Sequence, residues 1–123
     1  MKKVLVVEDN RAIRELYRRL IEANGFSMVE VLDFMPSSVE KSFLFYRDEI
    51  FCVVSDYNIG IDLSGTDVVR VVRGIDRTIL IFAICSYPED GNSMITAGAS
   101  RFFAKPVDMA ELSLALREAA LRR

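Results

Sequence analysis

The segment at residues 51–58 (Phe-Cys-Val-Val-Ser-Asp-Tyr-Asn) constrains the fold of this chain more than any other. Its apolar run includes two β-branched residues and ends at Asp56, a pattern typical of a short strand buried on both faces. Such strands belong to parallel sheets, whose ligands bind just beyond the carboxyl ends of the strands. We therefore expect Asp56 at that edge, either as a solvated strand end or as a functional carboxylate.

Other segments have the same strand character, and segments with helical periodicity lie between them in the sequence. The further strands are expected at residues 4–7, 27–34, 78–85 and 101–104. The first expected helix is capped by Asn10 and ended by Gly25, and the second starts at Pro36 with an apolar stripe that reaches Ile50. The third is expected at 68–75, ended by Gly74, and a short fourth at 88–97. The last is opened by a capping box of Asp108 and Glu111. Five strands that alternate with five helices predict one doubly wound α/β domain over residues 1–123.

Composition excludes several classes of function. Sixteen basic and 18 acidic side chains leave a net charge of -2, which gives no support for binding nucleic acid or an acidic membrane. No apolar run approaches the roughly 20 residues of a membrane span. The absence of histidine removes histidine-based catalysis and most zinc chemistry. Cys52 and Cys85 lie in strand-like apolar runs, which favours buried, reduced thiols over a disulfide.

The strand ends carry a consistent set of polar residues. Glu8 and Asp9 follow the first strand, Asp56 ends the third, Ser86 follows the fourth and Lys105 follows the fifth, whereas the second contributes nothing comparable. Three carboxylates, a hydroxyl and an ammonium should therefore converge on one edge of the sheet. Each of these residues alone has an ordinary explanation as a helix cap, a turn residue or a solvated end.

Clustered carboxylates repel one another and raise one another's pKa values. A hard divalent cation relieves that repulsion, and a ligand set of oxygens alone selects Mg²⁺ or Mn²⁺. The hydroxyl and the ammonium would then bind the oxygens of a phosphoryl group. The implied chemistry is attack by a carboxylate on phosphorus to form an aspartyl phosphate.

The strand ends at Glu8-Asp9, Ser-Asp56-Tyr-Asn58 and Cys-Ser86, together with Phe102-Phe-Ala-Lys105-Pro106, carry a family resemblance. Over its whole length the chain resembles the receiver domains of bacterial two-component response regulators. The resemblance implies the flavodoxin-like strand order 2-1-3-4-5, which receivers share with flavodoxin, and a cis Lys105–Pro106 bond. It also implies a cytoplasmic signalling protein that takes phosphate from a histidine kinase or a phosphotransfer protein and then binds a downstream protein.

The resemblance also assigns roles to the site residues. Asp56 accepts the phosphoryl group; Asp9, Asp56 and the Asn58 backbone carbonyl hold Mg²⁺, and Glu8 acts through metal-bound water. Ser86 and Lys105 bind phosphoryl oxygens. Phe102 is the aromatic switch of an output face formed by residues 78–85, 88–97, 101–104 and the last helix; an aromatic there is also ordinary core.

Three features depart from the family pattern. Gly60 stands where proline is common, in a loop from Asp56 to Gly65 that is one residue longer than usual. Tyr87 follows Ser86 where a small residue is preferred, so its ring is expected either to guard access to Asp56 or to pack beside the fourth helix. No output domain follows the fifth helix, which predicts a receiver that stands alone unless the sequence is cut from a longer protein.

Two other functions compete with this hypothesis. An aspartyl-phosphate phosphatase of the haloacid dehalogenase type needs a second aspartate two residues after the nucleophile, and Asn58 occupies that position. We therefore expect no enzymatic turnover. A pseudo-receiver that acts only as an interaction module would not need the acids, serine and lysine that this sequence retains. A nucleotide or flavin site has no support, because no glycine-rich phosphate loop follows the first strand.

Overall fold

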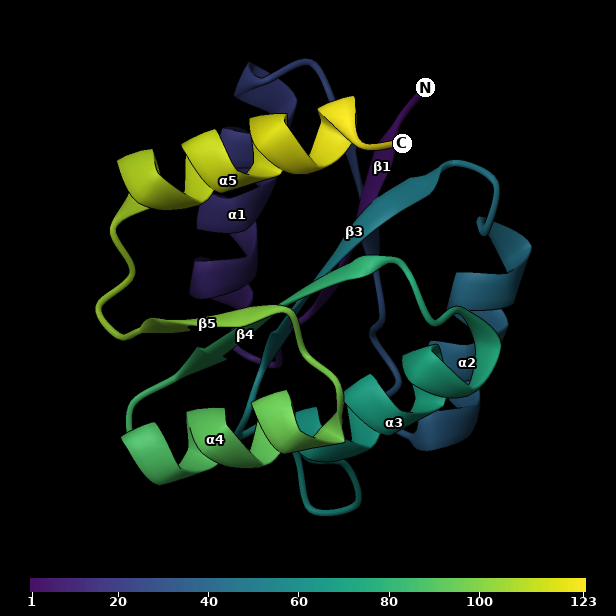
Figure 1. Cartoon of the computed structure of the whole chain (residues 1–123), viewed down its shortest axis with the longest axis vertical. Helices are drawn as coiled ribbons and strands as arrows, with labels where there is room; N and C mark the ends of the chain where they lie inside the picture. Colours follow the sequence, from purple (N-terminus) through teal and green to yellow (C-terminus); the bar gives the residue numbers. More distant parts are fainter.

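A computed structural model describes residues 1–123 as a five-stranded parallel sheet in the order β2-β1-β3-β4-β5 (Figure 1). The strands are β1 (Lys3–Val7), β2 (Ser27–Glu30), β3 (Ile50–Asp56), β4 (Leu80–Cys85) and β5 (Arg101–Ala104). The helices are α1 (Arg11–Ala23), α2 (Pro36–Phe45), α3 (Gly65–Ile75), α4 (Pro88–Ala97) and α5 (Met109–Leu121). The predicted doubly wound architecture and the strand order are confirmed.

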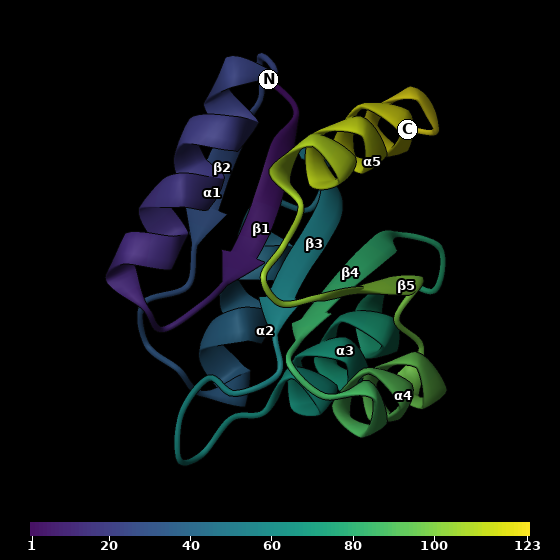
Figure 2. The same cartoon turned by 90° about the vertical axis from the view of Figure 1, so that its left-hand side faces the viewer.

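Helices cover both faces of the sheet. Helices α1 and α5 lie on one face, and α2, α3 and α4 lie on the other (Figures 1 and 2). Side chains of β1 alternate between the two apolar cores: Val4 and Val6 pack with α1 and α5, whereas Leu5 and Val7 pack with α2, α3 and α4. All seven residues of β3 are buried. This double-sided burial explains why the central strands read as continuous apolar runs.

Several helix ends follow the sequence signals. The Asn10 side chain accepts a hydrogen bond from the Ile13 N–H at the start of α1. Gly25 follows α1 with φ +85°, the left-handed conformation that glycine adopts without strain. At α5 the predicted capping box is only half present. The Asp108 side chain caps the helix, but the Glu111 carboxylate pairs with Arg101 at 2.7 Å instead of reaching back.

Other predicted boundaries were wrong. Strand β2 ends at Glu30 rather than at residue 34, because the chain leaves the sheet before the turn that opens α2. Ile50 begins β3 and does not extend the stripe of α2, and β4 begins at Leu80. Gly74 lies inside α3, which ends at Ile75 because the Asp76 side chain accepts hydrogen bonds from the N–H groups of the next turn.

Cys52 and Cys85 are buried free thiols, as the sequence predicts. None of the helices combines the length and the apolar character needed to cross a membrane.

Candidate functional site

Polar groups from three strands meet at one edge of the sheet. Glu8 and Asp9 directly follow β1, Asp56 is the last residue of β3, and Lys105 directly follows β5. A carboxylate oxygen from each of the three acids lies within 4.8 Å of the others. The Lys105 Nζ lies 2.8 Å from Asp56 Oδ1. The arrowheads of β1 and β3 in Figure 2 mark this edge, and both chain termini lie toward the opposite end.

Two of the three acids are buried, and their burial sets the electrostatics of the site. The exposed fractions of Glu8 and Asp56 are 2% and 4%, whereas Asp9 is exposed. Burial raises the pKa of Glu8 to about 7, although the Asn10 N–H donates to Glu8 Oε1 at 3.0 Å and opposes the shift. Burial also raises the pKa of Asp56, against the opposing effect of Lys105. The site therefore holds its negative charge at a cost.

One oxygen of the acidic cluster has no protein partner. Glu8 Oε2 is buried and accepts no hydrogen bond. A buried polar atom normally has a partner, and a cation bound among the acids would supply one. The available donors are all oxygens, the ligands that Mg²⁺ and Mn²⁺ prefer. The residues of this edge therefore fit a hard divalent cation.

The lysine of the site is tied to the same acid. Desolvation lowers the pKa of Lys105, but the ion pair with Asp56 outweighs that effect and raises it. The next peptide bond, Lys105–Pro106, is cis, as the family resemblance implies. Lys105 therefore supplies a permanent positive charge beside Asp56.

The loop between β3 and α3 is a small hairpin. An isolated antiparallel bridge joins Asn58 to Ser64, and the Gly60 N–H donates to the Leu63 carbonyl at 3.2 Å. Ile59 and Leu63 are buried, whereas Ile61 at the tip is fully exposed. Two apolar side chains, Ile59 and Leu63, thus anchor this loop.

Gly65 brings the start of α3 against the backbone of Asp56. A Cβ atom at Gly65 would lie 2.4 Å from the Asp56 carbonyl oxygen and 2.8 Å from Tyr57 Cα. The Gly65 N–H donates to the Tyr57 carbonyl at 2.8 Å. Only a residue without a side chain permits this close approach.

The remaining predicted residues lie along β4, α4 and β5. Ser86 follows β4 at the same edge, is exposed and makes no side-chain hydrogen bond to the acids. Tyr87, which precedes α4, is 59% exposed. Phe102 is 37% exposed and lies against Gly91 of α4, where an added Cβ would stand 2.8 Å from Phe102 Cγ. Their predicted roles in phosphate binding, access and switching stay predictions.

Sequence reasoning missed two residues next to the acidic turn. The Arg14 Nη1 donates to the backbone carbonyls of Glu8 at 2.9 Å and Asp9 at 3.3 Å. Glu30 at the end of β2 lies 3.9 Å from Arg14 Nε. The second strand thus adds no residue to the acidic cluster, but its Glu30 contacts the arginine that binds the backbone of the acidic turn. The only signal in the sequence was a basic residue one turn into the helix that follows the acids.

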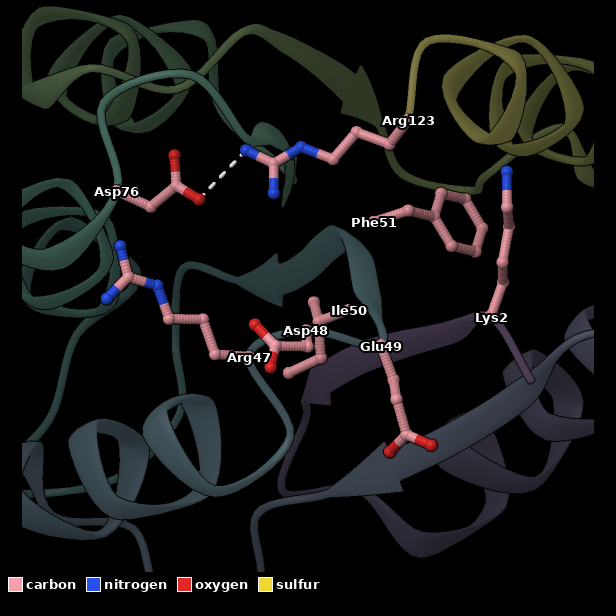
Figure 3. Close-up of a pocket in the computed structure, with 8 residues that line it drawn as sticks. All are labelled: Lys2, Arg47, Asp48, Glu49, Ile50, Phe51, Asp76 and Arg123. Carbon is pink, nitrogen blue, oxygen red and sulfur yellow. Dashed lines mark hydrogen bonds and ion pairs between the residues drawn. The ribbon is translucent and has the colours of Figure 1, made fainter.

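A hollow of about 320 Å³ lies at the opposite end of the sheet (Figure 3). Its lining residues are Lys2, Arg47, Asp48, Glu49, Ile50, Phe51, Asp76 and Arg123. Arg123 pairs with Asp76 at 2.8 Å, and Lys2 donates to the Ala120 carbonyl. Desolvation opposes ionisation of Asp76, but the Thr78 N–H, Arg123 and the Ile79 N–H together lower its pKa to about 2. Asp76, Arg123 and Lys2 therefore already have protein partners at this end of the sheet.

The doubly wound α/β fold and its cluster of three acids and a lysine at the carboxyl edge of the sheet agree with the class of receiver domains. The family model described as the response regulator receiver domain matches residues 4–117. This chain belongs to the response regulator receiver family. Receiver domains are generally signalling modules rather than enzymes.

Individual relatives agree with this assignment. The chain is 33% identical over 123 residues to response regulator MprA of Mycobacterium sp. (strain KMS), covering 98% of this chain and 51% of that protein. The chain thus spans about half the length of the curated relatives it matches. The fold matches a receiver domain protein from Clostridium thermocellum with a TM-score of 0.87 at 22% identity, covering 99% and 96% of the two chains.

A further structural neighbour is the receiver domain of the sensor histidine kinase PA1611 from Pseudomonas aeruginosa. Its TM-score is 0.79 at 22% identity, and the match covers 95% of each chain. That structure has a magnesium ion coordinated in its active site cleft. The present chain has a cluster of three acids, Glu8, Asp9 and Asp56.

Proposed function

We propose that this receiver accepts a phosphoryl group on Asp56 from a phosphohistidine of a histidine kinase or phosphotransfer protein. The observation that carries the proposal is the ion pair of Asp56 with Lys105 inside a cluster that leaves Glu8 Oε2 unpartnered. A carboxylate oxygen of Asp56 attacks phosphorus, the phosphorus–nitrogen bond breaks, and the imidazole leaves with the electron pair. The product is an aspartyl phosphate.

The residues of the acidic edge have separate roles in this transfer. Asp9, Asp56 and the Asn58 backbone carbonyl would hold Mg²⁺ or Mn²⁺, with Glu8 acting through a metal-bound water. When bound, the cation supplies positive charge that offsets the charge of the phosphoryl oxygens. Lys105 exchanges its partner from the Asp56 carboxylate to a phosphoryl oxygen. Ser86 donates a hydrogen bond to another phosphoryl oxygen, and its exposed position leaves the hydroxyl free to do so.

The output is a change in protein binding in the cytoplasm, as part of a two-component phosphorelay, without direct contact to nucleic acid by this domain. Ser86 and Phe102 would pass the phosphorylated state to the face formed by β4, α4, β5 and α5. The part-exposed ring of Phe102 on the backbone of Gly91 supports this role, because that ring is in contact with α4. A downstream protein would then read the position of α4.

The two rival functions have less support. Turnover as a phosphatase needs a carboxylate that takes a proton from the attacking water. The exposed residue two positions after Asp56 is Asn58, whose amide cannot take a proton. A pseudo-receiver has no use for acids whose burial raises their pKa values, since buried carboxylates cost stability without a ligand.

The proposal is tested by intact mass after incubation with acetyl phosphate and Mg²⁺. We expect one phosphoryl adduct on the wild type and none on Asp56→Asn. Asp62→Asn is the matched control, because it removes an exposed acid from the neighbouring hairpin. An adduct on Asp56→Asn, or equal labelling in EDTA, would contradict the proposal.

A further inference from the structure

The side chain of Arg14 occupies an unusual place behind the acidic turn. It projects from the first turns of α1, and only 12% of it is exposed. One nitrogen, Nη1, donates to the carbonyls of both Glu8 and Asp9. These are the peptide groups that carry two of the three clustered carboxylates. The guanidinium therefore holds the backbone of the turn without occupying any carboxylate oxygen of the cluster.

The edge strand holds this arginine in place. Glu30 of β2 lies 3.9 Å from Arg14 Nε and also pairs with Arg18 one turn further along α1. Arg18 in turn lies 3.3 Å from Glu15. A chain of charges thus runs from the β2 end to the acidic turn. Within it, the guanidinium of Arg14 lies between Glu30 and the backbone carbonyls of the acidic turn.

The arrangement carries a cost that packing alone does not explain. Arg14 Nε is buried and has no hydrogen-bond partner, and a partly satisfied buried cation destabilises a fold. A lysine would bury less polar surface, but it presents one ammonium in place of a planar fork. The planar fork places Nη1 between two successive carbonyls while Nε lies 3.9 Å from Glu30 Oε1.

We propose that Arg14 is a positioning residue of the cation site and that Glu30 fixes its orientation. This inference rests on the proposed function, because it assigns to Arg14 the geometry of the acids that would hold Mg²⁺. Arg14 sets the direction in which Glu8 and Asp9 present their side chains. Without Glu30, the guanidinium is free to rotate toward the carboxylates and to compete with the cation.

The test measures Mn²⁺ binding directly, by electron paramagnetic resonance of the free ion during titration. We compare the wild type with Arg14→Lys, Glu30→Gln and Arg18→Lys. The last is a matched control, because Arg18 shares the partner Glu30 but does not contact the acidic turn. Residues that orient metal ligands typically contribute about 10- to 100-fold in affinity, so we expect Arg14→Lys to raise the dissociation constant about tenfold.

The other two variants should change the Mn²⁺ affinity less than Arg14→Lys does. Glu30→Gln should weaken Mn²⁺ binding by about threefold to tenfold, and Arg18→Lys should leave it within about twofold of the wild type. Thermal unfolding of the metal-free proteins should place Arg14→Lys and Arg18→Lys within a few degrees of each other. That result separates positioning from general stability, because both substitutions remove one buried or part-buried guanidinium.

Two outcomes would overturn the inference: an unchanged Mn²⁺ affinity in Arg14→Lys, or a loss of affinity in Arg18→Lys as large as in Arg14→Lys. Neither would bear on phosphoryl transfer, which is tested by the adduct on Asp56. Conversely, a wild type that binds Mn²⁺ and responds to Arg14→Lys but forms no adduct would refute the proposed function alone.

Discussion

The two ends of the sheet each hold a largely buried carboxylate, and the two carboxylates are perturbed in opposite directions. At the amino end, Asp76 accepts hydrogen bonds from two backbone N–H groups and from Arg123, and its pKa falls to about 2. At the carboxyl end, Glu8 accepts one backbone hydrogen bond and leaves an oxygen unpartnered, and its pKa rises to about 7. A saturated carboxylate stabilises the fold, whereas an unsaturated one keeps its capacity to bind something else.

The largest expected contrast is in the stability of the metal-free protein. Asp76→Ala removes hydrogen bonds to a charged acceptor and should lower the free energy of unfolding by roughly 2 kcal/mol. Asp9→Ala and Asp56→Asn each remove a repelling charge, and they should leave that free energy unchanged or raise it. Urea denaturation followed by circular dichroism compares the three variants with the wild type. Strong destabilisation by Asp56→Asn would show that Asp56 is structural.

The two acids also predict opposite pH dependences of stability. The pKa of Asp76 is about 2, below its ordinary value of 3.8, so its contribution is present above that ordinary value and is lost as the pH falls toward 2. The pKa of Glu8 is about 7, above its ordinary value of 4.5, so the stability of the fold is lost as the pH rises from 4.5 through 7.

We therefore expect the metal-free protein to be most stable at about pH 4, between the ordinary pKa values of the two acids, with roughly 2 kcal/mol lost on either side. Denaturation at a series of pH values measures both slopes. Glu8→Gln should flatten the upper slope and Asp76→Ala the lower one. A stability that rises steadily to neutral pH would contradict the opposition between the two ends.

Added Mg²⁺ should act on the carboxyl end alone. A cation that binds only the folded state stabilises it by mass action, by about 1.4 kcal/mol at ten times the dissociation constant. The melting temperature of the wild type and of Asp76→Ala should rise equally with Mg²⁺, and that of Asp9→Ala should not respond. An Asp9→Ala protein that keeps the full Mg²⁺ response would place the cation elsewhere.

The smallest expected effect concerns Tyr87. Positioning of water controls hydrolysis of an aspartyl phosphate, and Asn58 orients a water without taking its proton. If the ring of Tyr87 restricts the approach, Tyr87→Ala should speed both decay of the phosphorylated protein and its formation from acetyl phosphate by about twofold to fivefold. Equal decay rates would show that this ring, which is 59% exposed, does not guard the site.

The sequence predicts the central part of this structure well because its signals are local. Strand β3 is buried on both faces, so its apolar run and its end at Asp56 are visible without any partner. Parallel pairing then brings the ends of β1, β3 and β5 to one edge, which is why the acids and Lys105 could be placed together. The strand order came from the family resemblance, since no local pattern contains it.

The features that the sequence did not predict depend on contacts between distant segments. The end of α3 depends on an Asp76 side chain that Arg123 holds from 47 residues away, and no glycine signal reports that pairing. The roles of Arg14 and Glu30 depend on the rotation of α1 against an edge strand whose apolar alternation is weak. Residues that position a site through a second side chain leave little trace in spacing or composition.

The close approach at Gly65 has a mechanical consequence. Helix α3 starts so close to the backbone of Asp56 that even a Cβ atom would not fit between them, which leaves little room for movement on that side of the strand. A strain that arises at Asp56 is therefore expected to propagate in the other direction, toward Ser86 and Tyr87, where the chain is exposed and α4 begins. The absence of a side chain at Gly65 thus favours movement on the side of the site where α4 begins.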